Sequence, residues 1–166
     1  KLSGKSQTTD NQNSFRVIAD HIKAATFILG DERGVPPSNV DQGYILRRYI
    51  RRVLRHLRLL GVELEEIDAT VELAKVVIEI YKEEYPIIEQ KKEFIFTELK
   101  REEDKFQKTL DKGIREFEKM VNKDQKITAK EAFLLYQSFG FPIEMIEELA
   151  KEKNVPIDID GFNKEF

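Results

Sequence analysis

Apolar side chains recur at helical spacing along most of this chain, and no segment shows the period of two that marks a half-buried strand. The first apolar stripe follows Ser14, which can cap a helix, and stops at Gly30. Further stripes occupy residues 42–60 and the segment from Val71 to about Tyr81. No internal repeat is evident. The pattern predicts an all-α fold, built as a helical bundle.

A proline at position 86 suits the first turn of a long helix that reaches about Val121. The apolar seam of this helix is spaced mostly by four and seven positions, but Glu102 and Glu103 interrupt it. We therefore expect a long helix packed antiparallel on its neighbours rather than an uninterrupted coiled coil.

Short helices are predicted at the C-terminal end of the chain. Thr128 followed by Glu131 forms a capping-box pattern, and Gly140 is the natural stop of the helix that the box opens. Pro142 starts the next helix, and Asp160 is placed to cap a last one.

The composition fits one compact, cytoplasmic unit. Of 166 residues, 40% are hydrophobic and 36% are charged, which gives enough apolar surface for a core. The chain has no cysteine, which excludes disulfides and thiolate metal sites, and no apolar run approaches the roughly 20 residues needed to span a bilayer. Residues 1–13 are polar and read as a flexible lead-in or the end of a preceding domain, so we expect the folded domain at residues 14–166.

The formal net charge of -3 hides a strongly basic helix. Opposite the apolar stripe of residues 42–60 lie Arg47, Arg48, Arg51, Arg52, Arg55 and Arg58. None of them has an acid three or four positions away on the same helix, so they need an external anion or a distant acidic partner. RNA phosphates match the planar guanidinium, which makes the first five arginines candidates for backbone contacts. Residues 63–68 or the long acidic helix could instead fold back onto them.

The sequence contains no motif that indicates a catalytic site. His21 and His56 lie on different predicted helices without a partner at metal-ligand spacing, so each is expected to be structural. A glycine-rich phosphate loop, a serine nucleophile elbow and a cysteine nucleophile are all absent. The carboxylates lie at spacings typical of a salt-bridged helix exterior.

Several ordered motifs resemble one enzyme family. Residues 16–27 (RVIADHIKAATF), the tripeptide Pro37-Ser38-Asn39 and residues 43–52 (GYILRRYIRR) are similar to the signature that opens the tRNA-recognition region of alanyl-tRNA synthetases. Residues 132–142 (AFLLYQSFGFP) resemble the second signature of that family, and Gly161-Phe162 resembles a segment shortly after it. The resemblance runs from about Leu2 to Phe166 and is weakest between Gly61 and Lys126.

The resemblance implies a binding module cut from a larger enzyme. The parent would be a class II alanine-tRNA ligase, whose catalytic core lies before this region and whose editing and dimerisation domains lie after it. This fragment alone would be inactive and would hold no cofactor, because ATP and Mg²⁺ belong to the catalytic core and Zn²⁺ to the editing domain. The implied partner is the acceptor stem of tRNA(Ala), with no DNA and no membrane, and the fragment is expected to be monomeric.

In the family, two side chains of this region read a wobble G·U pair at the third position of the acceptor stem. Asn39 matches the first of them. The second is an aspartate in the family, but Gln137 stands at the matching position, and Phe139 replaces a tyrosine of the same motif. A carboxylate can only accept hydrogen bonds, whereas an amide both accepts and donates, so we expect relaxed discrimination at this pair. Gln137 could also be a surface residue without RNA contact.

An alternative of another class remains open at this point. The seam from Ile88 to Val121 could bind a partner helix, which would make the chain a helical protein-interaction module.

Overall fold

The computed structural model describes residues 2–165. Its helices are α1 (Gln12–Gly30), α2 (Asp41–Leu59), the short 3-10 helix η1 (Leu64–Glu66), α3 (Ala69–Tyr81), α4 (Pro86–Gln90), α5 (Lys92–Asp124), α6 (Ala129–Phe139), α7 (Ile143–Glu152) and α8 (Ile159–Glu165). Within this described part no strand forms, and only an isolated parallel bridge joins Ile127 to Ile157. The predicted all-α class is confirmed, as are the long helix and the short helices that follow it.

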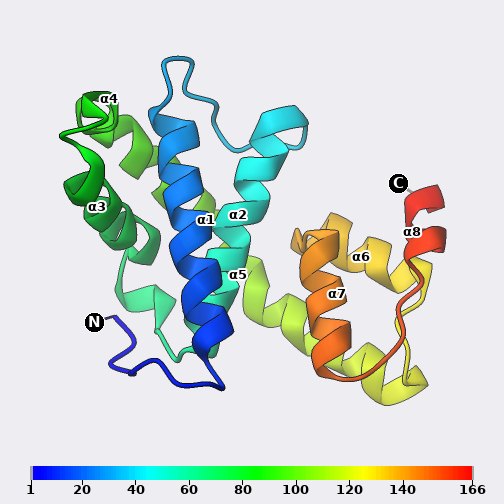
Figure 1. The fold of residues 1–166 in the computed structure, drawn as a ribbon. Coiled ribbons are helices and arrows are strands. Elements are labelled where there is room, and N and C mark those ends of the chain that lie inside the picture. The colour runs from blue at the N-terminus through cyan, green and yellow to red at the C-terminus, as the bar shows by residue number, and fades with distance from the viewer. Residues whose placement is uncertain (1, 166) are drawn as a thin grey trace. The chain divides into compact units, whose positions relative to one another are not determined.

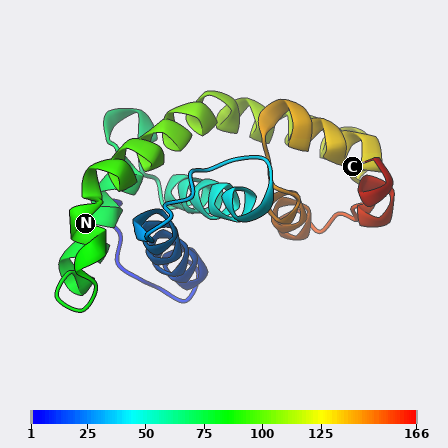
Figure 2. The same cartoon turned by 90° about the horizontal axis from the view of Figure 1, so that it is seen from above.

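The chain divides into two compact units, one ending at Gln107 and the other beginning at Lys108, so α5 contributes a half to each. In the first unit, α1 and α2 run side by side in opposite directions (Figures 1 and 2). The first helix buries one stripe at spacings of four, three and four positions: Ile18, Ile22, Ala25 and Leu29. The second buries Leu46, Ile50, Val53, Leu54 and Leu57. Both stripes follow the helical period, which is why sequence alone locates this pair.

The two acids that interrupt the long seam have structural partners in the first unit. Glu103 is 1% exposed, and its carboxylate accepts hydrogen bonds from the backbone N–H groups of Ala69 and Thr70, each at 3.0 Å. It thereby caps the N-terminus of α3, where the helix dipole favours negative charge. Burial raises the pKa of the Glu103 carboxyl, although the hydrogen bonds from Thr70 and Ala69 oppose the shift.

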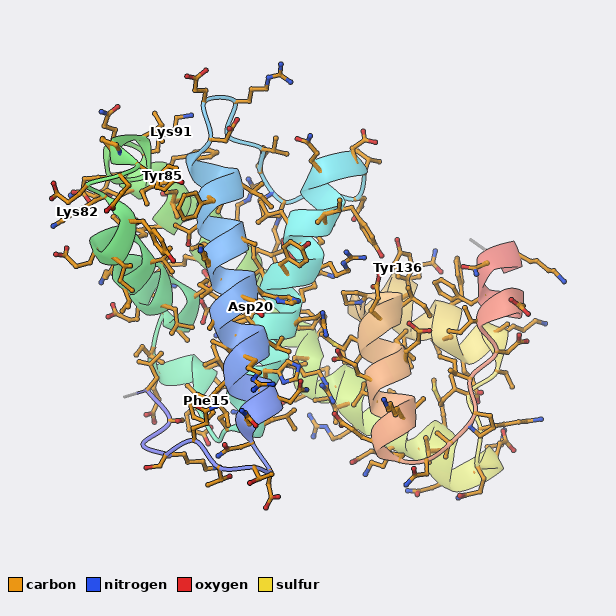
Figure 3. All side chains as sticks on the ribbon, in the orientation of Figure 1. Phe15, Asp20, Lys82, Tyr85, Lys91 and Tyr136 are labelled. Atoms are coloured by element: carbon orange, nitrogen blue, oxygen red, sulfur yellow. The ribbon has the colours of Figure 1, made fainter. Side chains whose placement is uncertain are left out.

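The long helix predicted from Pro86 is broken once. Pro86 does occupy the first turn of a helix, but that helix ends at Gln90 and α5 begins at Lys92. Lys91 lies between them with φ -97° and ψ 11°, and its Nζ donates to the backbone carbonyl of Glu32 at 2.7 Å (Figure 3). A side chain tied to the loop after α1 holds the chain at this corner, a contact between segments far apart that the apolar spacing could not indicate.

The second unit contains the end of α5 and the three short helices. The predicted capping box is confirmed: the Thr128 side chain accepts from the Glu131 N–H at 3.3 Å, and the Glu131 carboxylate accepts from the Thr128 N–H at 2.9 Å. Gly140 ends α6 with φ 70° and ψ 25°, the left-handed geometry expected at that stop. On α6, Tyr136 (Figure 3) packs edge-on against Phe162 of α8, with ring centroids 5.6 Å apart.

Two predicted helix caps are wrong. The first helix begins at Gln12, and Ser14 lies inside it, where its Oγ is 3.1 Å from Nδ1 of His56. At α8 the cap is Asp158, whose Oδ1 accepts from the Gly161 N–H at 2.8 Å, while Asp160 lies within the helix. The errors are shifts of three residues at α1, whose N-cap is Asn11, and of two residues at α8; at such helix starts several polar side chains compete for the same role. Lys1 and Phe166 lie outside the described residues.

Candidate nucleic-acid interface

The loop that carries Asn39 is folded onto the first turn of α2. Ser38 donates its backbone N–H to the carbonyl of Gly43 at 3.0 Å, and its hydroxyl donates to the carbonyl of Val40 at 2.9 Å. A Cβ at Gly43 would collide with the Ser38 side chain and come within 2.7 Å of the Pro36 carbonyl oxygen. Glycine at position 43 therefore lets the loop approach the helix, and the loop in turn fixes where Asn39 lies.

The side chain of Asn39 is exposed and anchored at one end. Its Oδ1 accepts a hydrogen bond from Nη1 of Arg47, in the second turn of α2. Among residues 2–165 no acceptor is found for the Asn39 amide nitrogen. With the oxygen engaged, the amide presents donors at the surface, a group suited to a carbonyl oxygen on a base edge.

Arg47 and Arg51 meet one buried carboxylate. Glu102 of α5, with a side chain only 2% exposed, lies 3.2 Å from Nε of Arg47 and accepts from Nε and Nη2 of Arg51 at 2.7 and 2.6 Å. Arg51 also stacks over the Phe106 ring, 5.1 Å from its centroid. The two guanidiniums, with side chains 16% and 13% exposed, are held inside the first unit by opposite charge. Asn39, Arg47 and Glu102 thus form a chain from surface to interior.

The rest of the arginine row is also engaged by the protein. Arg58 pairs with Glu63 and Glu65 at 2.9 and 3.4 Å, and Nη1 of Arg52 lies 2.7 Å from Nε2 of His21. The arginines that sequence analysis considered for backbone contacts differ in accessibility: Arg47, Arg48, Arg51 and Arg52 are partly exposed, whereas Arg55 is 2% exposed. The fold-back of acidic segments onto the row, the second alternative of the sequence analysis, is therefore observed for Arg47, Arg51 and Arg58.

Both histidines take part in packing. His21 lies edge-on to Tyr49, with ring centroids 4.8 Å apart, and contacts Arg52. His56 is 2% exposed and reaches Ser14. In the part of the chain that the structure describes, no group of three or more His, Asp or Glu side chains is placed to hold a metal ion. No helix of residues 2–165 is long and apolar enough to cross a membrane.

Gln137 belongs to the second unit, on the exposed face of α6 near a tightly packed corner. The hydroxyl of Thr109 donates to the carbonyl of Phe139 at 2.9 Å, which ties the end of α6 to α5. Phe141 is fully buried, and a Cβ on Gly113 would lie 2.5 Å from its ring. The missing side chain at Gly113 therefore allows the corner to lie on α5, and this contact fixes Gln137 relative to that helix.

A second set of cations, which sequence analysis missed, lies on the same stretch of α5. Four exposed basic side chains follow one another at spacings of four, three and four positions: Lys108, Lys112, Arg115 and Lys119. In sequence they look locally neutralised, since Asp111, Glu116 and Glu118 lie three or four positions from them. In the structure Glu116 pairs with Lys119 rather than with Lys112, at 2.5 Å, and Glu118 pairs with Lys153, just after α7, at 3.4 Å. No signal in the sequence indicated which of the neighbouring cations each acid would pair with.

Comparison with known proteins agrees with the motifs. The whole chain, residues 1–166, matches the family model described as tRNA synthetases class II (A). It is 45% identical to the alanine–tRNA ligase of Borrelia hermsii over 100% of this chain and 28% of that protein. It is 47% identical to the ligase of Treponema pallidum over 92% of this chain, and 42% identical to that of Prochlorococcus marinus over 91%. The chain spans 26% and 16% of the length of those two relatives.

These matches cover the motif-bearing segments in both units, the loop of Asn39 and the corner of Gln137 included. They confirm the resemblance to alanyl-tRNA synthetases that the signatures carried. The chain belongs to the class II (A) tRNA synthetase family, and its relatives there are alanine–tRNA ligases.

Proposed function

We propose that this chain recognises the acceptor stem of tRNA(Ala) as part of an alanine-tRNA ligase, whose full length attaches alanine to that tRNA with ATP in the cytoplasm. The observation that carries the proposal is the exposed Asn39 amide, oriented by Arg47, in a chain whose relatives are alanine–tRNA ligases. Specific RNA recognition needs polar groups held against base edges, and an oriented amide is such a group.

The chemical step and its cofactors are assigned to other parts of the parent. The family resemblance places ATP and Mg²⁺ in a catalytic core before this region and Zn²⁺ in an editing domain after it. Within this chain the work is positioning: a loop and a helix corner present two amides, and charged side chains hold the phosphate backbone. The fragment is proposed to act as a monomer, with neither DNA nor a membrane as a partner.

The competing function, a module that binds a partner helix through the long seam, is disfavoured by burial. All seam residues but one lie inside the protein. Ile114 is partly exposed, whereas the others are between 0% and 7% exposed: Ile88, Ile95, Leu99, Phe106, Leu110, Phe117 and Val121. An interaction helix would instead present such residues to solvent.

The test is a binding assay with acceptor-stem minihelices that carry G·U, G·C or A·U at the third pair, at one fixed salt concentration. The unmodified chain should bind all three, with a small penalty for losing G·U, because the Gln137 amide both donates and accepts. Asn39→Ala should weaken binding to the G·U stem. Gln137→Asp and Gln137→Glu, which restore acceptors only, should sharpen the choice by about 1–3 kcal/mol in whichever variant reaches the guanine amine.

Two results would count against this assignment. If the chain binds none of the three minihelices, acceptor-stem recognition by this segment is wrong. If it already rejects G·C and A·U as strongly as the acidic variants do, Gln137 does not relax recognition, and Asn39 with the shape of the stem must carry identity.

A further inference from the structure

Four exposed cations in the C-terminal half of α5 form a stripe, and among the described residues only Lys119 has an ion-pair partner, the exposed Glu116. Successive spacings of four, three and four positions keep Lys108, Lys112, Arg115 and Lys119 on one face of the helix, opposite the buried Leu110 and Phe117. Their Cα atoms span roughly 16 Å along the axis at about 1.5 Å per residue. A stripe of this length can face several phosphates of one strand.

The cations of this stripe differ from the arginines of α2 in the ion pairs that they form. Lys108 and Lys112 form no ion pair among residues 2–165, and Nε of Arg115 donates only to the backbone carbonyl of Asp111, at 3.2 Å. Lys119 has Glu116, but that pair is exposed, with Lys119 at 72%, so water and salt weaken it. By contrast, the carboxylate that holds Arg47 and Arg51 is buried. Cations already committed to a buried acid have little left to offer an RNA phosphate.

The surface beside the stripe is concave and partly apolar. Lys112, Arg115 and Lys119 line a hollow of about 380 Å³ together with Glu116 and the ring of Phe139. Phe139 ends α6, two positions after Gln137. Since the corner packs on α5 within one unit, the exposed amide of Gln137 and the cations have a fixed mutual position.

We infer that Lys108, Lys112, Arg115 and Lys119 bind the phosphate backbone of RNA, with the Phe139 ring as the apolar wall of the site for a sugar or a base. Charge complementarity identifies the occupant, because a row of exposed cations without a buried acidic partner favours a polyanion, and the apolar ring favours one that also carries stacking surfaces. The inference rests on the proposed function. It assigns the phosphate contacts to α5, whereas sequence analysis had assigned them to α2.

The experiment compares two triple variants of equal charge change in the whole 166-residue chain. In the first, Lys108, Lys112 and Arg115 become alanine. In the control, three lysines of the first unit that are at least partly exposed become alanine. Each has its own acid three positions earlier on the chain: Lys75 with Glu72, Lys82 with Glu79 and Lys92 with Glu89. Binding of a tRNA(Ala) acceptor minihelix and of a mixed-sequence RNA hairpin is measured across a salt series.

The α5 triple should lose at least tenfold in affinity for both RNAs at moderate salt, because phosphate contacts carry no sequence information. If each cation neutralises one phosphate, the slope of log affinity against log salt falls by about 0.9 per cation, so a fourfold rise in salt costs the unmodified chain about forty-fold more affinity than the variant. The control triple should keep the slope. A charge-keeping triple, Lys108→Arg, Lys112→Arg and Arg115→Lys, should keep both affinity and slope.

Each other outcome overturns the inference, and the outcomes separate it from the proposed function. If the unmodified chain binds RNA and the α5 triple binds equally well, the stripe is not the phosphate surface, while acceptor-stem recognition stands. If the control triple weakens binding as much, only net charge matters. If polyglutamate competes as well as RNA does, the stripe serves an acidic protein segment. If the unmodified chain binds no RNA, the proposed function fails too.

Folding of the variants is checked by far-ultraviolet circular dichroism. A purely structural role of these side chains would lower thermal stability without changing the salt slope of the remaining binding. Should the alanine triple lose helix content, the glutamine triple at the same positions keeps the aliphatic stems and carries the same comparison.

Discussion

Removing the negative charge of the buried Glu102 carboxylate should strongly destabilise the first unit. Glu102→Gln keeps the shape of the side chain and one acceptor oxygen, but it leaves Arg47 and Arg51 without the negative charge that lies 3.2 Å from one and 2.6 Å from the other. Removing one partner of a buried ion pair costs about 3–5 kcal/mol. Because both arginine side chains keep some exposure, at 16% and 13%, we expect about 3 kcal/mol, at the low end of that range.

The assay is urea unfolding followed by far-ultraviolet circular dichroism at neutral pH, with the midpoint compared at constant slope. Glu65→Gln is the matched control, because Glu65 pairs with Arg58 at 3.4 Å while its own side chain is 58% exposed. An exposed pair contributes only about 0–1 kcal/mol. High salt should leave the Glu102 effect nearly intact, since buried charges are poorly screened. If the two glutamine variants lose equal stability, the Arg47–Glu102–Arg51 cluster is not a buried ion pair in solution.

Two further predictions concern neighbouring features of the fold. Burial raises the pKa of Glu103, so the folded state holds that proton more tightly than the unfolded chain does. The resulting stabilisation is lost as pH rises from the ordinary carboxyl range through the raised pKa. The difference in unfolding free energy between the unmodified chain and Glu103→Gln should therefore change in that pH window and be constant above it. Gly113→Ala should lower the free energy of unfolding by about 1 kcal/mol. A Cβ 2.5 Å from the buried Phe141 ring costs about 1–3 kcal/mol, whereas the higher helix propensity of alanine contributes only about 1 kcal/mol. A variant more stable than the unmodified chain, which helix propensity alone predicts, would contradict the close packing.

The sequence predicted the helices because their signals are local. The apolar stripe of α1, the capping box of α6 and the left-handed Gly140 are each written within a few consecutive residues. The break at Lys91 was missed because its cause, a hydrogen bond to the loop after α1, comes from a segment about sixty positions away. Likewise the spacing that placed Arg55 on the polar face of α2 could not tell that this face is covered.

Charge partners were the least predictable part of the candidate site. Local spacing made the arginines of α2 look unbalanced, yet Glu102 of α5 neutralises Arg47 and Arg51. The same spacing made Lys112 look balanced by Glu116, which pairs with Lys119 instead. A helix surface offers each charge several neighbours of similar energy, so tertiary packing decides among them. Sequence analysis therefore located Asn39 and Gln137, which we propose to read bases, but it assigned the phosphate contacts to α2 rather than to α5.

The two proposed kinds of RNA contact place opposite demands on a side chain, and the residues proposed for each differ accordingly. A group that reads a base edge discriminates only if it is held in one orientation, and the buried Glu102 meets that demand by fixing Arg47, which fixes the Asn39 oxygen. A group that binds phosphate gains most when it is solvated and uncommitted, as Lys108 and Lys112 are among the described residues, because its binding releases counterions. Mutations of Asn39, Arg47 or Glu102 should therefore change the relative affinities for different acceptor stems. Mutations of the α5 stripe should instead change the affinity for every stem alike.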